Sequence, residues 1–329
     1  MILTLVEHDR GAIAETSLEA VTLARSLAEP AGEPVEAVVL GAGGAAAAAR
    51  LSVAGVDRVH ACEGELLDEY APEAWGAALT ALVDDLSPSA LLASGTARGD
   101  EVLAHAAARM QAPLATACTD IMADGEGGWA LRRLRWGGIL IEEARLRAAV
   151  KLATVAPHSR DVVPADGPGE ATVRAHAPEL AEALGRTKVL GRAVQADGVT
   201  LATAPVVVSG GRGVGSAEGF AVLEELAELV AGAVGCSRVA TSNGWRPHSD
   251  QVGQTGTRVA PDLYIACGIS GATQHWVGCM NASRILAINT DPEAPMVTRA
   301  DHAVIGDVHE VLPAVVAEIR SRRAATVDA

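Results

Sequence analysis

Aromatic side chains make up only 2% of this 329-residue sequence, so its cores must be built from smaller aliphatic residues. Hydrophobic residues still reach 49% and charged residues 20%, which is the balance of a globular chain and excludes a disordered one. Cores of Ala, Val, Leu and Ile suit parallel strands that are covered by helices. The composition therefore favours the α/β class.

Basic residues are also few: the sequence has 26 Lys and Arg against 41 Asp and Glu. The formal net charge of −15 would repel a phosphate backbone, and the sequence has no Lys/Arg stripe with interleaved aromatic residues. Anionic membrane surfaces would repel the chain in the same way. We therefore expect no nucleic-acid partner.

Long apolar runs and paired cysteine motifs are missing as well. No stretch approaches 18 consecutive apolar residues, and the opening MILTLVEHDR lacks the basic and apolar regions of a secretion signal. The five cysteines show no CxxC or Cys/His ligand spacing, so we expect reduced, mostly buried thiols and no metal site. These features predict a soluble, cytoplasmic protein without membrane insertion.

The first half alternates short apolar runs with helical stretches. Strands are expected at 2–6, 35–40, 56–61 and 89–94, in a βαβ rhythm that predicts a parallel sheet. Strand-like segments at 129–136 and 148–155 indicate that later, partly antiparallel strands complete this sheet.

The length suggests two domains, and we place the boundary near residue 195, giving an N-terminal α/β domain at 1–195 and a C-terminal domain at 196–329. The second domain begins with a strand at 204–209, the turn SGGRGVGS and a helix expected from about 218 to 234. Strand, glycine turn and helix form the unit that binds phosphate in doubly wound folds. Further units with strands at 263–266, 285–288 and 303–305 complete a second, Rossmann-like sheet.

Three glycine-containing segments of the C-terminal domain could face a ligand. In SGGRGVGS the glycines would let the backbone approach a pyrophosphate and Arg212 could neutralise it; the alternative is a tight strand-to-helix turn with a solvated arginine. The loop Val252-Gly-Gln-Thr-Gly256 either presents polar groups to a ligand or simply connects two elements. In GISGATQH, Ser270 can cap the following helix or donate to an anion, and His275 can face the ligand or be structural.

Two polar residues stand at the ends of later strands. Asn289 and Asp307 occupy positions where doubly wound folds read an adenosine, but taken singly Asn289 is better explained as a turn residue and Asp307 as a helix N-cap. Neither a nucleophile–base pair nor a two-carboxylate arrangement stands out, so no catalytic residue is assigned. Together the three glycine segments indicate a nucleotide-shaped ligand along one sheet edge.

The ordered set SGGRGVGS, GCSR, VGQTG, LYIACGISGATQH, ILAINTDPEAP and IGD resembles the FAD-binding domain of the electron-transfer flavoprotein alpha subunit family over residues 204–320. The N-terminal segments LVEH and LLASGTARGDEVLAHAAAR are similar to the first domain of that family. The resemblance implies an electron carrier with one FAD per heterodimer and an N-terminal domain that contacts the partner. It also implies AMP in the partner beta subunit, acyl-CoA dehydrogenases or similar flavoenzymes as donors, and a membrane quinone oxidoreductase as acceptor.

The resemblance further implies the residues that contact FAD. Thr255 would hydrogen-bond the flavin N5 region, His275 the N1/C2 carbonyl region, and Arg238 would lie against the ring. The full implied set is Arg212, Ser237, Arg238, Val252, Gly253, Gln254, Thr255, Ser270, Gly271, Ala272, Thr273, Gln274, His275, Asn289 and Asp307.

The sequence departs from the family pattern after GCSR, where Thr241-Ser-Asn-Gly-Trp245 replaces a common Val-Asp-x-Gly run, and at Thr273, where Ile is usual. These departures leave the subgroup open, including a bifurcating type of electron-transfer flavoprotein. Two alternatives from other classes are an NAD(P)-linked flavoprotein reductase and a non-catalytic module that senses adenylates. The incomplete GxGxxG pattern and the lack of an acidic ribose reader weigh against the first of these.

Overall fold

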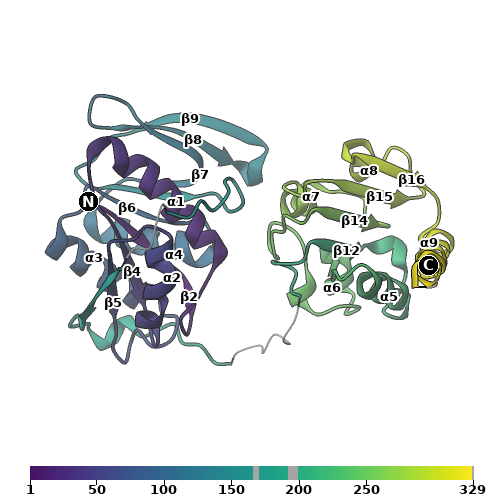
Figure 1. Cartoon of the computed structure of the whole chain (residues 1–329), viewed down its shortest axis with the longest axis horizontal. Coiled ribbons are helices and arrows are strands. Elements are labelled where there is room, and N and C mark those ends of the chain that lie inside the picture. Colours follow the sequence, from purple (N-terminus) through teal and green to yellow (C-terminus); the bar gives the residue numbers. More distant parts are fainter. Residues whose placement is uncertain (166–169, 192–198, 328–329) are drawn as a thin grey trace. The chain divides into compact units, whose positions relative to one another are not determined.

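The apolar runs of the two halves form two separate sheets in the computed structural model, which describes residues 1–165, 170–191 and 199–327 (Figure 1). The chain divides into two units, Met1–Arg192 and Ala193–Ala329. The boundary expected near residue 195 lies outside the described residues. No helix in the described part of the chain is long and apolar enough to cross a membrane.

The N-terminal unit is built on a nine-stranded sheet whose central strands are buried on both faces, as their near-continuous apolar sequences require. All neighbouring strands are parallel except β7–β8 and β8–β9, which are antiparallel. In order across the sheet the strands are β11 (Thr172–His176), β5 (Arg58–Cys62), β4 (Val35–Leu40), β1 (Ile2–Leu5), β6 (Ala90–Ser94), β10 (Lys151–Val155), β7 (Leu114–Ala123), β8 (Trp129–Arg135) and β9 (Leu140–Leu146).

Helices cover both faces of this sheet. On one face α3 (Pro72–Leu86) and α4 (Ala97–Met110) pack together and bury Leu79 and Leu103. On the other face α1 (Glu15–Ala28) and α2 (Ala48–Val53) bury Leu23 and Leu51. The small hairpin of β2 (His8–Asp9) and β3 (Ala12–Ile13) precedes α1.

The antiparallel completion of this sheet is confirmed, but its polar outer strand was not expected. β9 reads LIEEARL and is mostly exposed, so it lacks the apolar alternation of a half-buried strand. Pairing with β8 instead brings opposite charges together across the two strands, as between Arg132 and Glu143 at 3.2 Å.

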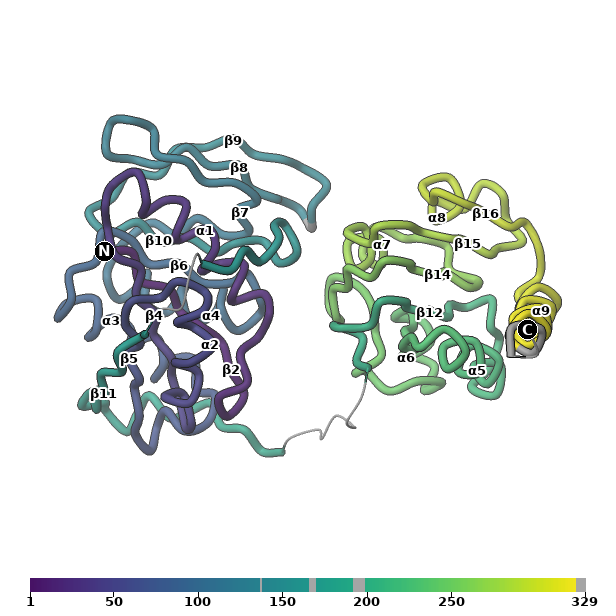
Figure 2. The backbone as a smooth tube through the Cα atoms, viewed as in Figure 1, coloured from purple at the N-terminus to yellow at the C-terminus, as the bar shows by residue number. Residues whose placement is uncertain are grey.

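The C-terminal unit contains a five-stranded, fully parallel sheet. Figure 2 traces the backbone of this unit in green to yellow. Its strand order, taken along the sequence, is 2-1-3-4-5, which places the topological switch point between the first and third strands. In order across the sheet these are β13 (Ala233–Cys236), β12 (Val206–Gly210), β14 (Leu263–Cys267), β15 (Ile285–Asn289) and β16 (His302–Ile305).

Two clusters of buried side chains hold this sheet between helices. α5 (Ala221–Leu229) and α9 (Val308–Val327) lie alongside each other on one face, where Leu223 and Leu312 are fully buried. α7 (Thr273–Cys279) and α8 (Pro295–Arg299) contribute Cys279 and Met296 to the cluster on the other face. The short helix α6 (Arg238–Ser242) follows β13.

The helix expected over 218–234 was predicted too long. α5 ends at Leu229, and Ala231 then adopts a left-handed conformation with φ +51°. A Cβ on Gly232 would lie 2.4 Å from the Val206 carbonyl oxygen, so the chain turns there against β12. The residues that follow form the edge strand β13, whose apolar sequence is continuous with that of the helix and concealed the boundary.

All five cysteines are free, buried thiols, as the sequence predicted, and burial raises their pKa values to about 12.

Candidate cofactor-binding site

The predicted site residues gather at one edge of the C-terminal sheet. Because the five strands are parallel, their carboxyl ends all meet at that edge. An isolated parallel bridge between Cys236 and Gln251 attaches the VGQTG loop to the same edge, beside β13, and a second bridge, between Val252 and Thr257, closes the loop on itself. The residues follow the strands in this way: Arg212 after β12, Ser237 and Arg238 after β13, residues 270–275 after β14, Asn289 at the end of β15, and Asp307 after β16.

Two glycine turns meet backbone to backbone at the switch point. The N–H of Gly211 donates to the Cys267 carbonyl at 2.9 Å, and that of Gly213 donates to the Gly268 carbonyl at 3.0 Å. A Cβ on Gly213 would lie 2.7 Å from the Gly268 Cα, so only glycine fits. The turn thus places backbone without side chains at the switch point and leaves the Arg212 side chain exposed beside it.

An open hollow of about 470 Å³ lies between α6 and the VGQTG loop, next to β13. Its lining residues are Arg238, Thr241, Ser242, His248, Gln251 and Thr255 (the Thr255 hollow). Arg238 and Thr255 are exposed in it, whereas Gln251 is only 2% exposed. The structure therefore brings together Arg238 and Thr255, which the resemblance assigned to the flavin ring.

The VGQTG loop is held tightly against the start of α7. The N–H of Gln254 donates to the Gln274 carbonyl at 2.7 Å. A Cβ on Gly278 would lie 2.3 Å from the Gly253 nitrogen, so the helix and the loop approach as closely as two backbones can. Gln254 itself is exposed, and the contact keeps the polar loop and the GISGATQH turn in one place.

His275 is buried at the first turn of α7. Its Nε2 lies 2.8 Å from the hydroxyl of Tyr264, which is fully buried. Burial lowers the pKa of His275 to about 4, with a smaller opposing effect from the Val252 backbone, so the ring is neutral at pH 7. Its Nδ1 makes no hydrogen bond of good geometry among the described residues, although the Val252 backbone lies close enough to act on the pKa of the ring.

A second buried polar atom lacks a partner at this edge. Ser237 is 9% exposed, and its Oγ finds no partner within the described part of the chain. Buried polar groups are nearly always paired in native proteins. Two orphaned atoms, Ser237 Oγ and His275 Nδ1, at the carboxyl edge of the sheet fit a site that is completed by a polar ligand.

The rest of the GISGATQH turn is shaped by α8. Gly271 has φ +79°, and a Cβ there would lie 2.4 Å from the Met296 nitrogen. Ala272 occupies the N-cap of α7, so of the two roles considered for Ser270 the capping role does not occur, and the Ser270 side chain is exposed. Ala272 and Gln274 are also exposed, and Thr273 is half-buried.

Asn289 and Asp307 make the local bonds that the sequence suggested. Asn289 donates from Nδ2 to the Ile269 carbonyl at 2.9 Å and accepts the Asp291 N–H, which ties the β15 turn to the β14 turn. Asp307 accepts the His309 N–H at 2.9 Å and caps α9. Both side chains stay at the same edge as the glycine turns.

Sequence reasoning missed two buried residues of this site. Gln251 contacts Thr241 and Thr255 through its side chain, and Tyr264 contacts His275. Each is a polar side chain, Gln251 in an irregular segment and Tyr264 in an apolar strand. Such a residue indicates a site only when its hydrogen-bond partner is known.

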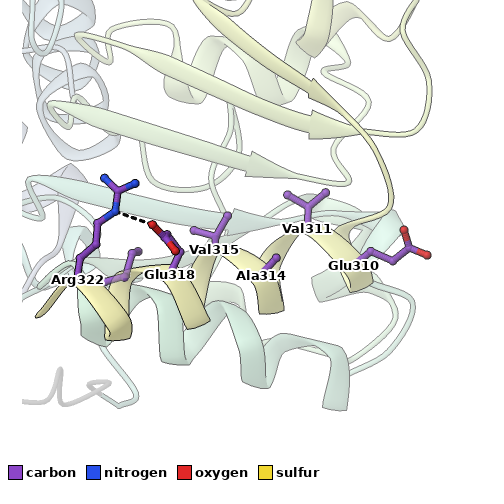
Figure 3. Close-up of a pocket in the computed structure, with 7 residues that line it drawn as sticks. Glu310, Val311, Ala314, Val315, Glu318 and Arg322 are labelled. Carbon is purple, nitrogen blue, oxygen red and sulfur yellow. Dashed lines mark hydrogen bonds and ion pairs between the residues drawn. The ribbon is translucent and has the colours of Figure 1, made fainter. Parts of the chain in front are cut away.

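A larger open groove, of about 610 Å³, runs along α9 and contains no predicted site residue. Its floor is apolar, with Val311, Ala314 and Val315, and an ion pair between Glu318 and Arg322 at 2.7 Å closes one end (Figure 3). No group of His, Cys, Asp and Glu side chains in the described ranges could hold a metal ion.

Comparison with known proteins gives matches over both units. Residues 2–181 match the family model of the electron transfer flavoprotein domain, and residues 200–280 match that of the electron transfer flavoprotein FAD-binding domain. The chain is 39% identical to the electron transfer flavoprotein subunit alpha of Mycobacterium leprae, over 98% of each chain. It is 35% identical to the protein of the same name from Thermoanaerobacterium thermosaccharolyticum, over 95% of this chain and 96% of the other.

A relative with another name is the protein FixB of Bradyrhizobium diazoefficiens, which is 36% identical over 96% of this chain and 88% of its own length. The named relatives match over nearly the whole chain, and the FAD-binding match includes the glycine turns, the Thr255 hollow and His275 but ends before β15 and β16. The chain therefore belongs to the electron-transfer flavoprotein alpha subunit family and carries its FAD-binding domain.

Proposed function

We propose that this chain holds one FAD along the carboxyl edge of its C-terminal sheet and, paired with a beta subunit, carries electrons between other redox proteins. FAD supplies the redox chemistry, because its flavin ring takes up and releases electrons. The observation that carries the proposal is the gathering of the Thr255 hollow, the paired glycine turns and two unpartnered buried polar atoms at one edge.

The residues that would hold FAD divide by chemistry. Arg212 offers a positive charge beside exposed backbone at the switch point. A pyrophosphate bound there would be stabilised both by that charge and by the backbone N–H groups. Ser237 and Ser270 offer hydroxyl groups, and Asn289 and Asp307 lie where an adenosine is read. The remaining proposed contacts are the backbone and side chains of Val252, Gly253, Gln254, Gly271, Ala272, Thr273 and Gln274.

Three side chains would tune the flavin. Arg238 is exposed in the Thr255 hollow, and its charge would stabilise electron density on a ring placed there. His275 would present a neutral ring nitrogen, since its pKa is lowered to about 4 by burial. Thr255 would place a hydroxyl group at the flavin N5 region.

The partners follow from the family. The relatives named subunit alpha imply a second subunit. For this chain we propose AMP in that beta subunit, flavin dehydrogenases as donors and a quinone oxidoreductase as acceptor. Five free, buried thiols are consistent with a reducing compartment such as the cytoplasm.

An NAD(P)-linked reductase is a weaker candidate. Dinucleotide-binding folds of that type use an acidic residue near the end of the second strand to read the ribose. Here β13 ends at Cys236 and is followed by Ser237 and Arg238, none of which is acidic.

The test is to co-express the chain with a candidate beta subunit and record the visible spectrum of the purified complex during stepwise reduction. We expect flavin absorption bands, and altered reduction behaviour in Arg238→Ala and His275→Ala. Arg284→Ala is the matched control, because Arg284 is exposed at the opposite, amino end of β15. A colourless complex that binds adenylates would reject the FAD assignment in favour of a sensor.

A further inference from the structure

A buried glutamine links two threonine hydroxyls beside the Thr255 hollow. Gln251 Oε1 lies 2.8 Å from Thr241 Oγ1, and Gln251 Nε2 lies 2.9 Å from Thr255 Oγ1. The Gln251 backbone is held in place because its carbonyl accepts the Thr257 N–H at 2.7 Å. Only the side-chain amide has freedom left, since it can rotate by half a turn without moving the loop.

In one orientation of the amide, Thr255 is a donor toward the hollow. The Thr241 hydroxyl donates to Gln251 Oε1, and Gln251 Nε2 donates to Thr255 Oγ1. A hydroxyl group carries a single proton. The Thr255 proton is therefore left over and points to whatever fills the hollow.

In the reversed orientation, Thr255 is an acceptor toward the hollow. Gln251 would donate to Thr241, and Thr255 would donate to Gln251. This reversal needs a second acceptor for the Thr241 proton, and the structure contains one, because the Arg238 carbonyl lies 2.9 Å from Thr241 Oγ1. In both orientations, each of the two contacts between Gln251 and a threonine thus pairs one donor with one acceptor.

A flavin ring needs both kinds of partner in turn. N5 of an oxidised flavin has a lone pair and accepts a hydrogen bond. Full reduction brings two electrons from an electron-donating protein and a solvent proton to N5, which then becomes an N–H donor. A fixed donor at this place would favour the oxidised ring and disfavour the reduced one.

We propose that Thr241, Gln251 and Thr255 form a reversible hydrogen-bond relay, in which rotation of the Gln251 amide switches Thr255 from donor to acceptor as flavin N5 gains its proton. Thr241 and Gln251 are positioning residues, because they act on the flavin only through Thr255. The relay rests on the proposed function, since it assumes that the flavin ring occupies the Thr255 hollow.

The test uses the FAD-loaded complex with its beta subunit and measures the two-electron midpoint potential of the flavin. Thr241→Val keeps the shape of the side chain and removes the hydroxyl. In the reversed orientation this substitution leaves an N–H of the Gln251 amide without its acceptor. In the orientation that makes Thr255 a donor, it leaves Gln251 Oε1 without its donor. A buried N–H without a partner is tolerated less well than a buried carbonyl oxygen without one. The relay should stay in the orientation that makes Thr255 a donor.

We expect Thr241→Val to shift the ratio of oxidised to reduced flavin about tenfold toward the oxidised form, which is a fall of about 30 mV in the midpoint potential. Thr241→Ser should restore the wild-type value, because it returns the hydroxyl. Thr298→Val is the matched control: the same change at an exposed threonine of α8 whose hydroxyl donates to the Pro295 carbonyl.

A midpoint potential for Thr241→Val that equals the control value, or lies above it, would overturn the relay while leaving FAD binding intact. A complex without flavin would instead overturn the proposed function. A second measurement does not depend on the potential. The side-chain amide NMR signal of Gln251, identified by its loss in Gln251→Leu, should move on reduction in the wild type and stay in place in Thr241→Val; an unmoved signal in the wild type would also reject the relay.

Discussion

At the scale of single residues, the site depends on polar groups whose properties are set by burial. His275 and Tyr264 are both buried, and their mutual hydrogen bond at 2.8 Å occupies one of the two imidazole nitrogens. A neutral imidazole held in this way provides a directed partner without the cost of a buried charge.

Burial of His275 should make the C-terminal unit sensitive to acid. The folded-state pKa is about 4 against an ordinary value of 6.5, so the unfolded chain takes up a proton that the folded chain refuses between these pH values. Stability is therefore lost as pH falls from 6.5 to 4, by up to about 3 kcal/mol.

His275→Gln should lack this part of the pH dependence. Urea unfolding of the flavin-free chain at about pH 7 and about pH 4.5, followed by circular dichroism, measures it. Parallel losses of stability in the wild type and the variant would contradict the prediction.

The contact between the two glycine turns should tolerate no side chain. Gly213→Ala places a Cβ 2.7 Å from the Gly268 Cα, and overpacking of this kind costs about 1–3 kcal/mol. We expect a lower melting temperature and a lower FAD content in the purified protein. Gly191→Ala is the control, since a Cβ there would meet nothing within 4 Å, and equal FAD contents in the two variants would refute the argument.

At the scale of elements, several helices begin at positions that also belong to the proposed site. Asp307 caps α9 through the His309 N–H, and α9 in turn buries Leu312 against the sheet. When one side chain has both a structural role and a binding role, two different substitutions can separate the two roles.

Asp307→Asn keeps an N-cap acceptor and removes the charge, whereas Asp307→Ala removes both. We expect the alanine variant to lose about 1 kcal/mol of stability and the asparagine variant to lose little. If Asp307 contacts the adenosine of FAD, both variants should bind FAD more weakly in a titration of the flavin-free protein. Weaker binding by the alanine variant alone would assign Asp307 to capping only.

At the scale of the whole molecule, each unit carries its own hydrophobic core. The buried clusters of the first unit contain no residue of the second, and those of the second contain none of the first, among the described residues. Destabilisation should therefore stay within the unit in which it is introduced.

Leu312→Ala is the direct test of this separation. Leu312 is 0% exposed, and loss of such a side chain costs about 2–5 kcal/mol. Hydrogen exchange read out by mass spectrometry should speed up throughout the C-terminal strands and remain unchanged in β1, β4 and β6. Faster exchange in those three strands would show that the two cores unfold together.

Much of this architecture could be predicted because its signals are local. Apolar runs such as those of β4 and β12 predicted buried parallel strands, and the glycines after β12 and β14 indicated the sheet edge at which we propose that FAD binds. The signal failed where two elements share one apolar run, as at the end of α5 and the start of β13, and where a strand is polar, as in β9. The hydrophobic period indicates which residues are buried. It cannot locate the boundary between two elements when the residues on both sides are buried alike.

The sequence by itself determined the α/β class, the repeated strand–turn–helix units and the family, because each depends on residues close together in the chain. Only the tertiary structure decided that Gly213 meets Gly268, that His275 meets Tyr264, and that Gln251 joins Thr241 to Thr255. These contacts depend on strand register and on the approach of separate loops. Neither is encoded in a local pattern, since both follow from how the whole sheet packs against its helices.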